Sequence, residues 1–269
     1  MGYVDIDGQP IHYDEYGSGE LSVVWLHCFG GSARIWRSLI PQFLGFRSIA
    51  IDTRGHGRSA KSVDRPGEAG VGMRRLADDV YRVTEALGVS RFAVIGHSLG
   101  GGMALRLAVD HPESLRGIVS VSGFPAGGSP RVDTADQVLD AYLRGFRDPD
   151  VQRAAVSGGF TPGAKVDDLI DELVEDGLRV HEDFYLSWLR DGLAYSNFEE
   201  DLEAVRCPST FLTGLRDANS PASGQLASAQ KVPGARIVLL NEEGHYWPWE
   251  NPDRFIAEVN FALAGFPRA

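Results

Sequence analysis

Residues 96–100 read G-H-S-L-G and place one serine between two glycines. The segment follows the apolar run F-A-V-I directly and leads into M-A-L-R-L-A-V, so a buried strand gives way to a helix with almost no loop. Such a turn exposes a serine hydroxyl at the rim of a sheet, beside the backbone N–H groups of a helix N-terminus. Glycines at positions 96 and 100 remove side chains that would collide in the turn. The pattern predicts Ser98 as a nucleophile, and the alternative is a helix start that merely packs closely.

A serine hydroxyl becomes a good nucleophile when a base, usually histidine, takes its proton. Three histidines follow Ser98 in the chain: His111, His181 and His245. His111 lies a helix length away from Ser98, and His181 lies in a long segment without strand patterns. His245 follows the apolar run A-R-I-V-L-L by a short loop, at the sheet edge where catalytic groups gather. We therefore predict His245 as the base.

The base needs a carboxylate to orient it. Asp217 follows the strand pattern S-T-F-L-T-G at the same edge, and the alternative is that it is a solvated turn residue. Asp52 is the reserve candidate, but it precedes Ser98 and is interpreted as tying down its own loop, T-R-G-H-G-R-S. His56 in that loop is interpreted as structural, with contact to substrate as the alternative.

Four stretches carry a resemblance to a known family: H-C-F-G-G (27–31), D-T-R-G-H-G-R-S (52–59), G-H-S-L-G-G (96–101), and G-L-R-D with E-G-H near the C-terminus. Together they resemble the α/β-hydrolase superfamily, over nearly the whole chain outside residues 124–205. In that superfamily the nucleophile, the acid and the histidine follow one another in the chain. The resemblance therefore implies a triad of Ser98, Asp217 and His245 and a two-step acyl transfer without a metal or cofactor.

The resemblance also implies an oxyanion hole made by the backbone N–H groups of Leu99 and Phe29. Relatives commonly have His-Gly where this chain has His27-Cys28. Cys28 adds a side chain to a tight loop and is interpreted as a small buried thiol, with a second nucleophile as the alternative. We expect His27 to prop this loop from below and His97 to point away from the rim.

These residues need a sheet to bring them together. The strand and helix patterns predict the α/β class, with a mostly parallel eight-stranded sheet, helices on both faces and a helical cap insertion. The N-terminus is predicted to form an antiparallel hairpin, and I-W-R-S-L-I-P-Q-F a short helix. Ser220-Pro221 and Asn251-Pro252 each have the pattern of a helix N-cap followed by an N1 proline. We expect a core of residues 1–123 and 206–269 and a cap of residues 124–205.

Aromatic residues are frequent in the expected cap, where Tyr195 is one of them. At helical spacing they are often a packing face, yet a cap of this size must also leave a slot over the nucleophile. The substrate is therefore expected to be a small or medium, mostly apolar ester or lactone. The tentative lining residues are Phe124, Phe160, Tyr185, Trp188 and Trp247.

Composition excludes several other classes of function. The 269 residues carry a net charge of −11 and no basic tract, which disfavours nucleic-acid binding. No apolar run approaches the roughly 18 residues of a membrane span, and the N-terminus lacks the pattern of a secretory signal. Cys28 and Cys207 are the only cysteines, and they have no metal-ligand spacing. We expect a cytoplasmic protein with a small-molecule substrate, either monomeric or homo-oligomeric.

Serine at the nucleophile position excludes those relatives, haloalkane dehalogenases and epoxide hydrolases, that use aspartate there. Carbon–carbon bond hydrolases, lactonases and cofactor-free haloperoxidases with perhydrolase activity keep the same triad and stay open as alternatives. A receptor of the same fold, which binds a small molecule and turns it over slowly, is an alternative of another class.

Overall fold

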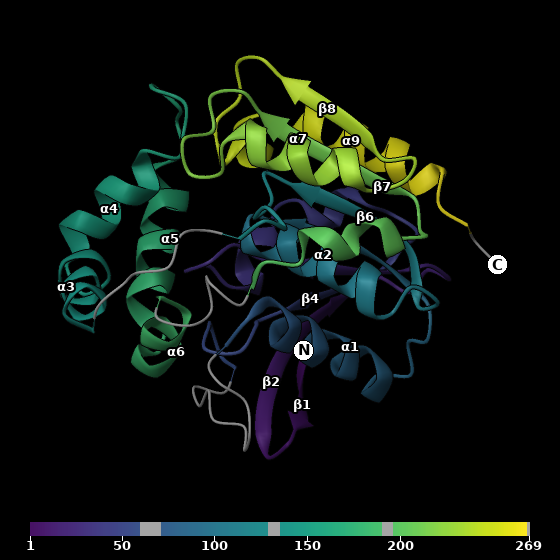
Figure 1. The fold of residues 1–269 in the computed structure, drawn as a ribbon, viewed down its shortest axis with the longest axis horizontal. Coiled ribbons are helices and arrows are strands. Elements are labelled where there is room, and N and C mark those ends of the chain that lie inside the picture. Colours follow the sequence, from purple (N-terminus) through teal and green to yellow (C-terminus); the bar gives the residue numbers. More distant parts are fainter. Residues whose placement is uncertain (60–70, 129–134, 190–195, 268–269) are drawn as a thin grey trace.

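The computed structural model describes residues 1–59, 71–128, 135–189 and 196–267. Eight strands form one sheet in the order β1-β2-β4-β3-β5-β6-β7-β8 (Figure 1). The strands are β1 (Gly2–Ile6), β2 (Gln9–Tyr16), β3 (Ser22–Leu26), β4 (Arg47–Ile51), β5 (Phe92–His97), β6 (Leu115–Val121), β7 (Ser209–Gly214) and β8 (Arg236–Leu240). β1 and β2 pair antiparallel and β2 joins β4 antiparallel, whereas all the remaining pairs are parallel. The predicted fold class and the N-terminal hairpin are confirmed.

The central strands are buried on both faces, which explains their continuous apolar sequences. In β3, Val24 and Leu26 belong to one hydrophobic core, and Val23 and Trp25 belong to a second core on the opposite face. This division follows from the alternation of side chains along a strand. A parallel sheet needs helices over both of its faces, so each core contains helical residues.

Helices cover both faces of the sheet (Figure 1). Residues of α1 (Met73–Ala86), α2 (Leu99–Asp110) and α7 (Ala222–Lys231) contribute to the first core. Residues of α8 (Trp247–Glu250) and α9 (Pro252–Ala264) contribute to the second. As predicted, the α9 start is capped, since the Asn251 side chain accepts from the Arg254 N–H at 3.4 Å and Pro252 occupies N1.

Among the residues that the structure describes between β6 and β7, there are four α-helices: α3 (Ala135–Gly145), α4 (Pro149–Ser157), α5 (Asp167–Arg179) and α6 (Glu182–Ser187). We call α3 to α6 and the residues that connect them the helical insertion. They lie together beside the sheet, where the carboxyl ends of β7 and β8 point toward them (Figure 1). The 3-10 helix η5 (Glu199–Ala204) then leads back into β7.

Two local predictions were wrong. The segment after β3 forms two 3-10 helices, η1 (Ala33–Trp36) and η2 (Ile40–Gln42), where one short helix was expected. Pro41, at the start of η2, lacks the N–H that would have continued the helical hydrogen bonding. Ser220 does not cap α7, because its hydroxyl donates to the Gly123 carbonyl at 2.7 Å and the helix begins at Ala222.

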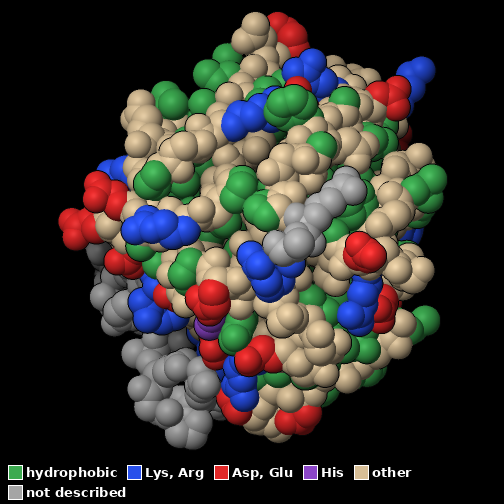
Figure 2. Space-filling model, turned by 90° about the vertical axis from the view of Figure 1, so that its right-hand side faces the viewer, with side chains coloured by type: hydrophobic (Ala, Val, Ile, Leu, Met, Phe, Trp, Pro, Cys, Tyr) green, Lys and Arg blue, Asp and Glu red, His purple; other side chains and the backbone are tan. Residues whose placement is uncertain are grey.

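The face opposite the helical insertion carries basic and acidic side chains interspersed with apolar ones (Figure 2). Within the described ranges, no helix combines the length and the apolar character needed to cross a membrane.

One buried ion pair joins the loop after β4 to α1. Arg54 Nε and Nη2 donate to the two carboxylate oxygens of Asp79 at 2.6 and 2.8 Å, and both side chains are buried. Removing one partner of such a pair leaves an uncompensated charge in a medium that solvates it poorly.

We expect Asp79→Ala to lower the free energy of unfolding by about 3–5 kcal/mol, measured by urea denaturation. Asp140→Ala is the matched control, because Asp140 pairs with Arg144 on an exposed helix face. The control should cost less than about 0.5 kcal/mol. Equal effects of the two substitutions would contradict the importance of burial.

Candidate functional site

Ser98 stands at the turn between β5 and α2, in the strained backbone conformation φ 55°, ψ −115°. Its N–H donates to the Val121 carbonyl at the end of β6, and its carbonyl accepts from Phe124 N–H at 2.7 Å. A Cβ atom at Gly96 would lie 2.0 Å from the Gly100 carbonyl oxygen, and one at Gly100 would lie 2.3 Å from the Leu26 carbonyl oxygen. No side chain fits at either position, as predicted, and the Ser98 side chain is left half-exposed at the rim.

The predicted base and acid meet at the carboxyl edge of the sheet. His245 Nδ1 lies 2.8 Å from Asp217 Oδ2, and both side chains are buried. Asp217 Oδ1 accepts from the backbone N–H groups of Asn219 and Ser220 at 2.9 and 2.7 Å. Asp217 is thus fixed by its own turn and is not a solvated residue. With the proton held on Nδ1 toward the carboxylate, Nε2 of His245 keeps a lone pair that can accept a proton.

His97 links the turn of Ser98 to the loop of His245. Its Nε2 donates to the His245 backbone carbonyl at 2.9 Å, and the two imidazole rings lie 4.7 Å apart between centroids. Burial, together with the neighbouring His245, lowers the pKa of His97 well below its ordinary value. The side chain is fully buried, in agreement with the expected direction away from the rim.

We call residues 28–32 the oxyanion loop. In the described part of the chain, the backbone N–H groups of Phe29 and Leu99 meet no protein acceptor, so both remain available as donors. His27 Nε2 accepts from the Thr53 N–H at 3.0 Å, which puts the ring proton on Nδ1, and Nδ1 donates to the Cys28 carbonyl at 2.7 Å. His27 therefore props the loop from below, as expected, and burial lowers its pKa.

Cys28 is a buried thiol that hydrogen-bonds to the hydroxyl of Tyr246. Burial raises the pKa of the thiol to about 12, against a smaller opposing effect of the Tyr246 hydrogen bond. Only the thiolate is a strong nucleophile, so this environment suits packing and disfavours the alternative of a second nucleophile.

The reserve carboxylate Asp52 has a structural position. Its Oδ1 accepts from Ala33 N–H at 2.6 Å and its Oδ2 accepts from Arg58 N–H at 3.0 Å. Burial alone would raise the pKa of Asp52, but His12, the nearby His27 and these two backbone donors outweigh it and lower the pKa. Asp52 therefore ties its own loop to the start of η1, as interpreted from the sequence.

The Phe29 ring is the centre of an aromatic cluster that joins the core to the helical insertion. Its centroid lies between 5.2 and 6.2 Å from the rings of His56, Phe146, Phe184, Tyr185 and Trp188. Phe124 reaches the same cluster through Trp188, at 5.9 Å. Burial holds the pKa of His56 down to about 3, so its ring is neutral at ordinary pH.

Of the five tentative pocket residues, Phe124, Tyr185 and Trp188 share this cluster. Phe160 lies elsewhere and stacks on Tyr246 at 4.6 Å. Trp247 is not part of this cluster either: it is fully buried and packs against Phe255 of α9 in the second core. Tyr195 lies outside the described residues.

The sequence did not reveal how the insertion is bonded to the loop that carries His245. The Gly159 carbonyl, between α4 and α5, accepts from the N–H groups of both His245 and Tyr246, at 2.8 and 3.2 Å. Thr161 N–H donates to the Glu250 carboxylate at 3.1 Å. The segment S-G-G-F-T-P was interpreted only as a break between helices. Every residue has a backbone carbonyl, so the residue type at position 159 does not indicate this contact.

Among the residues that the structure describes, no group of three or more His, Cys, Asp or Glu side chains is arranged to hold a metal ion.

Several known proteins are similar to this chain. A 2-hydroxy-6-oxononadienedioate/2-hydroxy-6-oxononatrienedioate hydrolase of Pseudomonas sp is 26% identical, over 93% of this chain and 90% of its own length. A putative carbamate hydrolase of Caulobacter sp. is 26% identical, over 98% and 96%. A solved N-acyl homoserine lactone degrading enzyme superposes with a TM-score of 0.80 at 26% identity, covering 96% of this chain and 99% of the other.

The family model described as the alpha/beta hydrolase fold matches residues 22–161. This match spans more than half of the chain and contains the oxyanion loop, the turn of Ser98 and the first half of the insertion. This match, together with the sheet order and the strained backbone of Ser98, shows that the chain belongs to the alpha/beta hydrolase fold family.

Proposed function

We propose that this protein is a serine hydrolase that cleaves a small or medium, mostly apolar carboxylic ester or lactone. The observation that carries the proposal is the 2.8 Å contact between His245 Nδ1 and Asp217 Oδ2 at the sheet edge where Ser98 is held. This contact supports an imidazole whose orientation is fixed and whose Nε2 can accept a proton. In this proposal the cap comprises residues 124–205, which include the helical insertion.

Each group has one role in the proposed reaction. Ser98 attacks the carbonyl carbon while His245 accepts the hydroxyl proton, and the imidazolium is stabilised by Asp217. The N–H groups of Phe29 and Leu99 donate to the developing oxyanion, and each such donor contributes about 3 kcal/mol. His245 then protonates the leaving group, and the same residue activates the water that releases the acid from Ser98.

The surroundings of Phe29 support this choice of substrate class. The described rings that contact it are uncharged, and His56 is neutral because its pKa is near 3. Aromatic walls bind an apolar acyl or alcohol group by burying its surface. This environment supports an apolar substrate over an ionised one.

Carbon–carbon bond cleavage is a second candidate, favoured by the 26% identity to the oxononadienedioate hydrolase over 93% of this chain. A dioate substrate carries two carboxylates, which need cationic partners when they leave water. The rings that surround Phe29 in the described part of the chain supply none, so we place the ester or lactone first.

The first test addresses the nucleophile and the substrate class together. The wild type should release nitrophenol from p-nitrophenyl acetate and should be labelled by a fluorophosphonate, whereas Ser98→Ala should lose labelling and about 10⁴–10⁶-fold in kcat. A panel of esters, lactones and diketones of graded size then ranks the classes by kcat/KM. Turnover far below one per minute on every member would favour the receptor alternative.

The second test addresses the base and the acid. His245→Ala and Asp217→Asn should each lower kcat by about 10³–10⁴-fold, because the imidazole is removed in one and loses its correct tautomer in the other. His111→Ala is the matched control, since His111 stacks on Tyr81 away from the site. Activity that survives in His245→Ala and disappears in His56→Ala would reassign the base.

The third test addresses the thiols. Cys28 and Cys207 are buried, and burial raises their pKa values to about 12 and about 11. At pH 8 the thiolate fraction is therefore on the order of 10⁻³ or less. Ellman's reagent should react with neither thiol of the folded protein and with both in guanidinium. Rapid modification of the folded protein, with loss of activity that Cys28→Ala prevents, would contradict this reading.

A further inference from the structure

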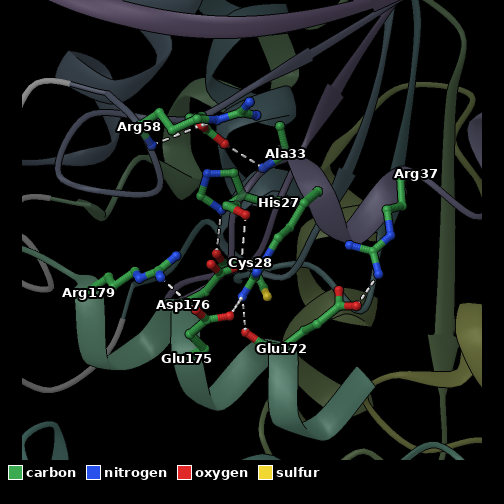
Figure 3. Close-up of polar contacts among 12 residues, drawn as sticks. His27, Cys28, Ala33, Arg37, Arg58, Glu172, Glu175, Asp176 and Arg179 are labelled. Atoms are coloured by element: carbon green, nitrogen blue, oxygen red, sulfur yellow. Dashed lines mark hydrogen bonds and ion pairs between the residues drawn. The ribbon is translucent and has the colours of Figure 1, made fainter. Parts of the chain in front are cut away.

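Helix α5 of the insertion lies directly against the oxyanion loop (Figure 3). Gly30 in this loop has φ +76°, and a Cβ atom built there would lie 3.7 Å from the Cα of Gly177 in α5. The backbone of the insertion is thus a close neighbour of the residue that follows Phe29. A shift of α5 would displace the loop, because closely packed atoms transmit displacement to one another.

The oxyanion loop ends at Ser32, which occupies the N-cap of η1 without making a side-chain capping bond. Its hydroxyl donates to Asp176 Oδ2 of α5 at 2.7 Å. The same oxygen accepts from Arg34 Nε at 2.9 Å. Asp176 is only 4% exposed, so water does not readily replace these two bonds.

The core holds the loop at its two ends. His27 Nδ1 donates to the Cys28 carbonyl at one end, and Asp52 accepts from Ala33 N–H at 2.6 Å at the other. A third hydrogen bond, from Ser32 to Asp176, fixes the loop to helix α5 of the insertion. The stretch between these holds contains Phe29, whose N–H is a proposed oxyanion donor.

Other ionic contacts between α5 and η1 are more exposed. Arg34 Nη2 also reaches Glu175, and Arg37 pairs with Glu172. The Glu175 and Arg37 side chains are 48% and 56% exposed. Solvent and salt screen pairs of this kind, so they contribute little to the position of the loop.

We propose that Asp176 is a positioning residue for the reaction, acting through Ser32 to fix the direction of the Phe29 N–H. This inference rests on the proposed function of Ser98 and the oxyanion hole. An oxyanion donor is useful only when it points at the position that the charged oxygen will occupy, with a tolerance of about half an ångström. Loss of the carboxylate frees Ser32 and leaves Arg34 without its buried partner. The loop then relaxes, and the Phe29 N–H no longer points at the oxyanion position.

A cavity of about 330 Å³ opens onto this cluster, and its walls include Ser32, Arg34, Arg179 and Asp176 itself. The space left by truncation of Asp176 therefore opens to solvent beside Arg34. A small carboxylate such as formate fits the vacated position and can accept from the same two donors, which makes chemical rescue a direct test of the carboxylate's role.

The experiment compares Asp176→Ala with the wild type, using p-nitrophenyl acetate as substrate and a trifluoromethyl ketone that mimics the tetrahedral intermediate. We expect kcat to fall by about 10–100-fold with KM within about twofold, because the lost interaction acts in the transition state. Affinity for the ketone should fall in parallel with kcat/KM. Formate at millimolar to molar concentration should restore kcat in Asp176→Ala but not in Asp176→Leu, whose side chain fills the space.

Glu175→Ala is the matched control, because Glu175 is on the same helix and binds the same arginine from its exposed side. Its kcat should stay within about twofold of the wild type. Ser32→Ala removes the hydroxyl alone and should lower kcat with unchanged KM, so it carries the test if Asp176→Ala does not fold.

An active wild type with unchanged kcat in both Asp176→Ala and Ser32→Ala would overturn the positioning role while leaving the proposed function intact. A loss of kcat that formate does not restore, and that Glu175→Ala shares, would also overturn it. A wild type without turnover and without labelling of Ser98 would overturn the proposed function itself.

Discussion

The close approach of two backbone segments at the turn of Ser98 is the constraint on which the site depends. The chain passes from β5 to α2 so tightly that Cβ atoms at Gly96 and Gly100 would lie 2.0 and 2.3 Å from carbonyl oxygens. The strain of φ 55° at Ser98 is maintained by the surrounding sheet, since the Val121 carbonyl and the Phe124 N–H hold the serine backbone on both sides. Ser98, the proposed nucleophile, is therefore placed by packing before any substrate arrives.

Much of this arrangement could be predicted from sequence because it depends on residue type. Buried parallel strands need continuous apolar runs, a sharp strand-to-helix turn needs glycine, and the carboxyl ends of strands collect the reactive side chains. Asp217 and His245 were identified for these reasons, and the structure brings them within 2.8 Å. The same reasoning set Asp52 apart from Asp217, and in the structure the Asp52 carboxylate accepts from the backbone N–H groups of Ala33 and Arg58.

What the sequence did not reveal depends on tertiary contacts. Trp247 was expected near substrate because it follows His245 closely, yet the turn into α8 directs it onto Phe255. Asp176 looks like any acidic residue of an amphipathic helix, and only the fold shows that it lies under Ser32. Gly159 acts through its carbonyl, a group that every residue has, so its contact with His245 and Tyr246 leaves no trace in residue type.

The contact of Gly159 has a consequence for how the molecule responds to warming. One carbonyl oxygen accepts from the two successive N–H groups of His245 and Tyr246, so the insertion is bonded directly to the loop that carries the imidazole. Peripheral helices open at lower free energy than the central strands of a sheet. If the insertion opens on heating, the loop of His245 would thus lose its hydrogen bonds to Gly159 while the sheet is still intact. Inactivation would precede melting, and it would reverse on cooling as long as the sheet had persisted.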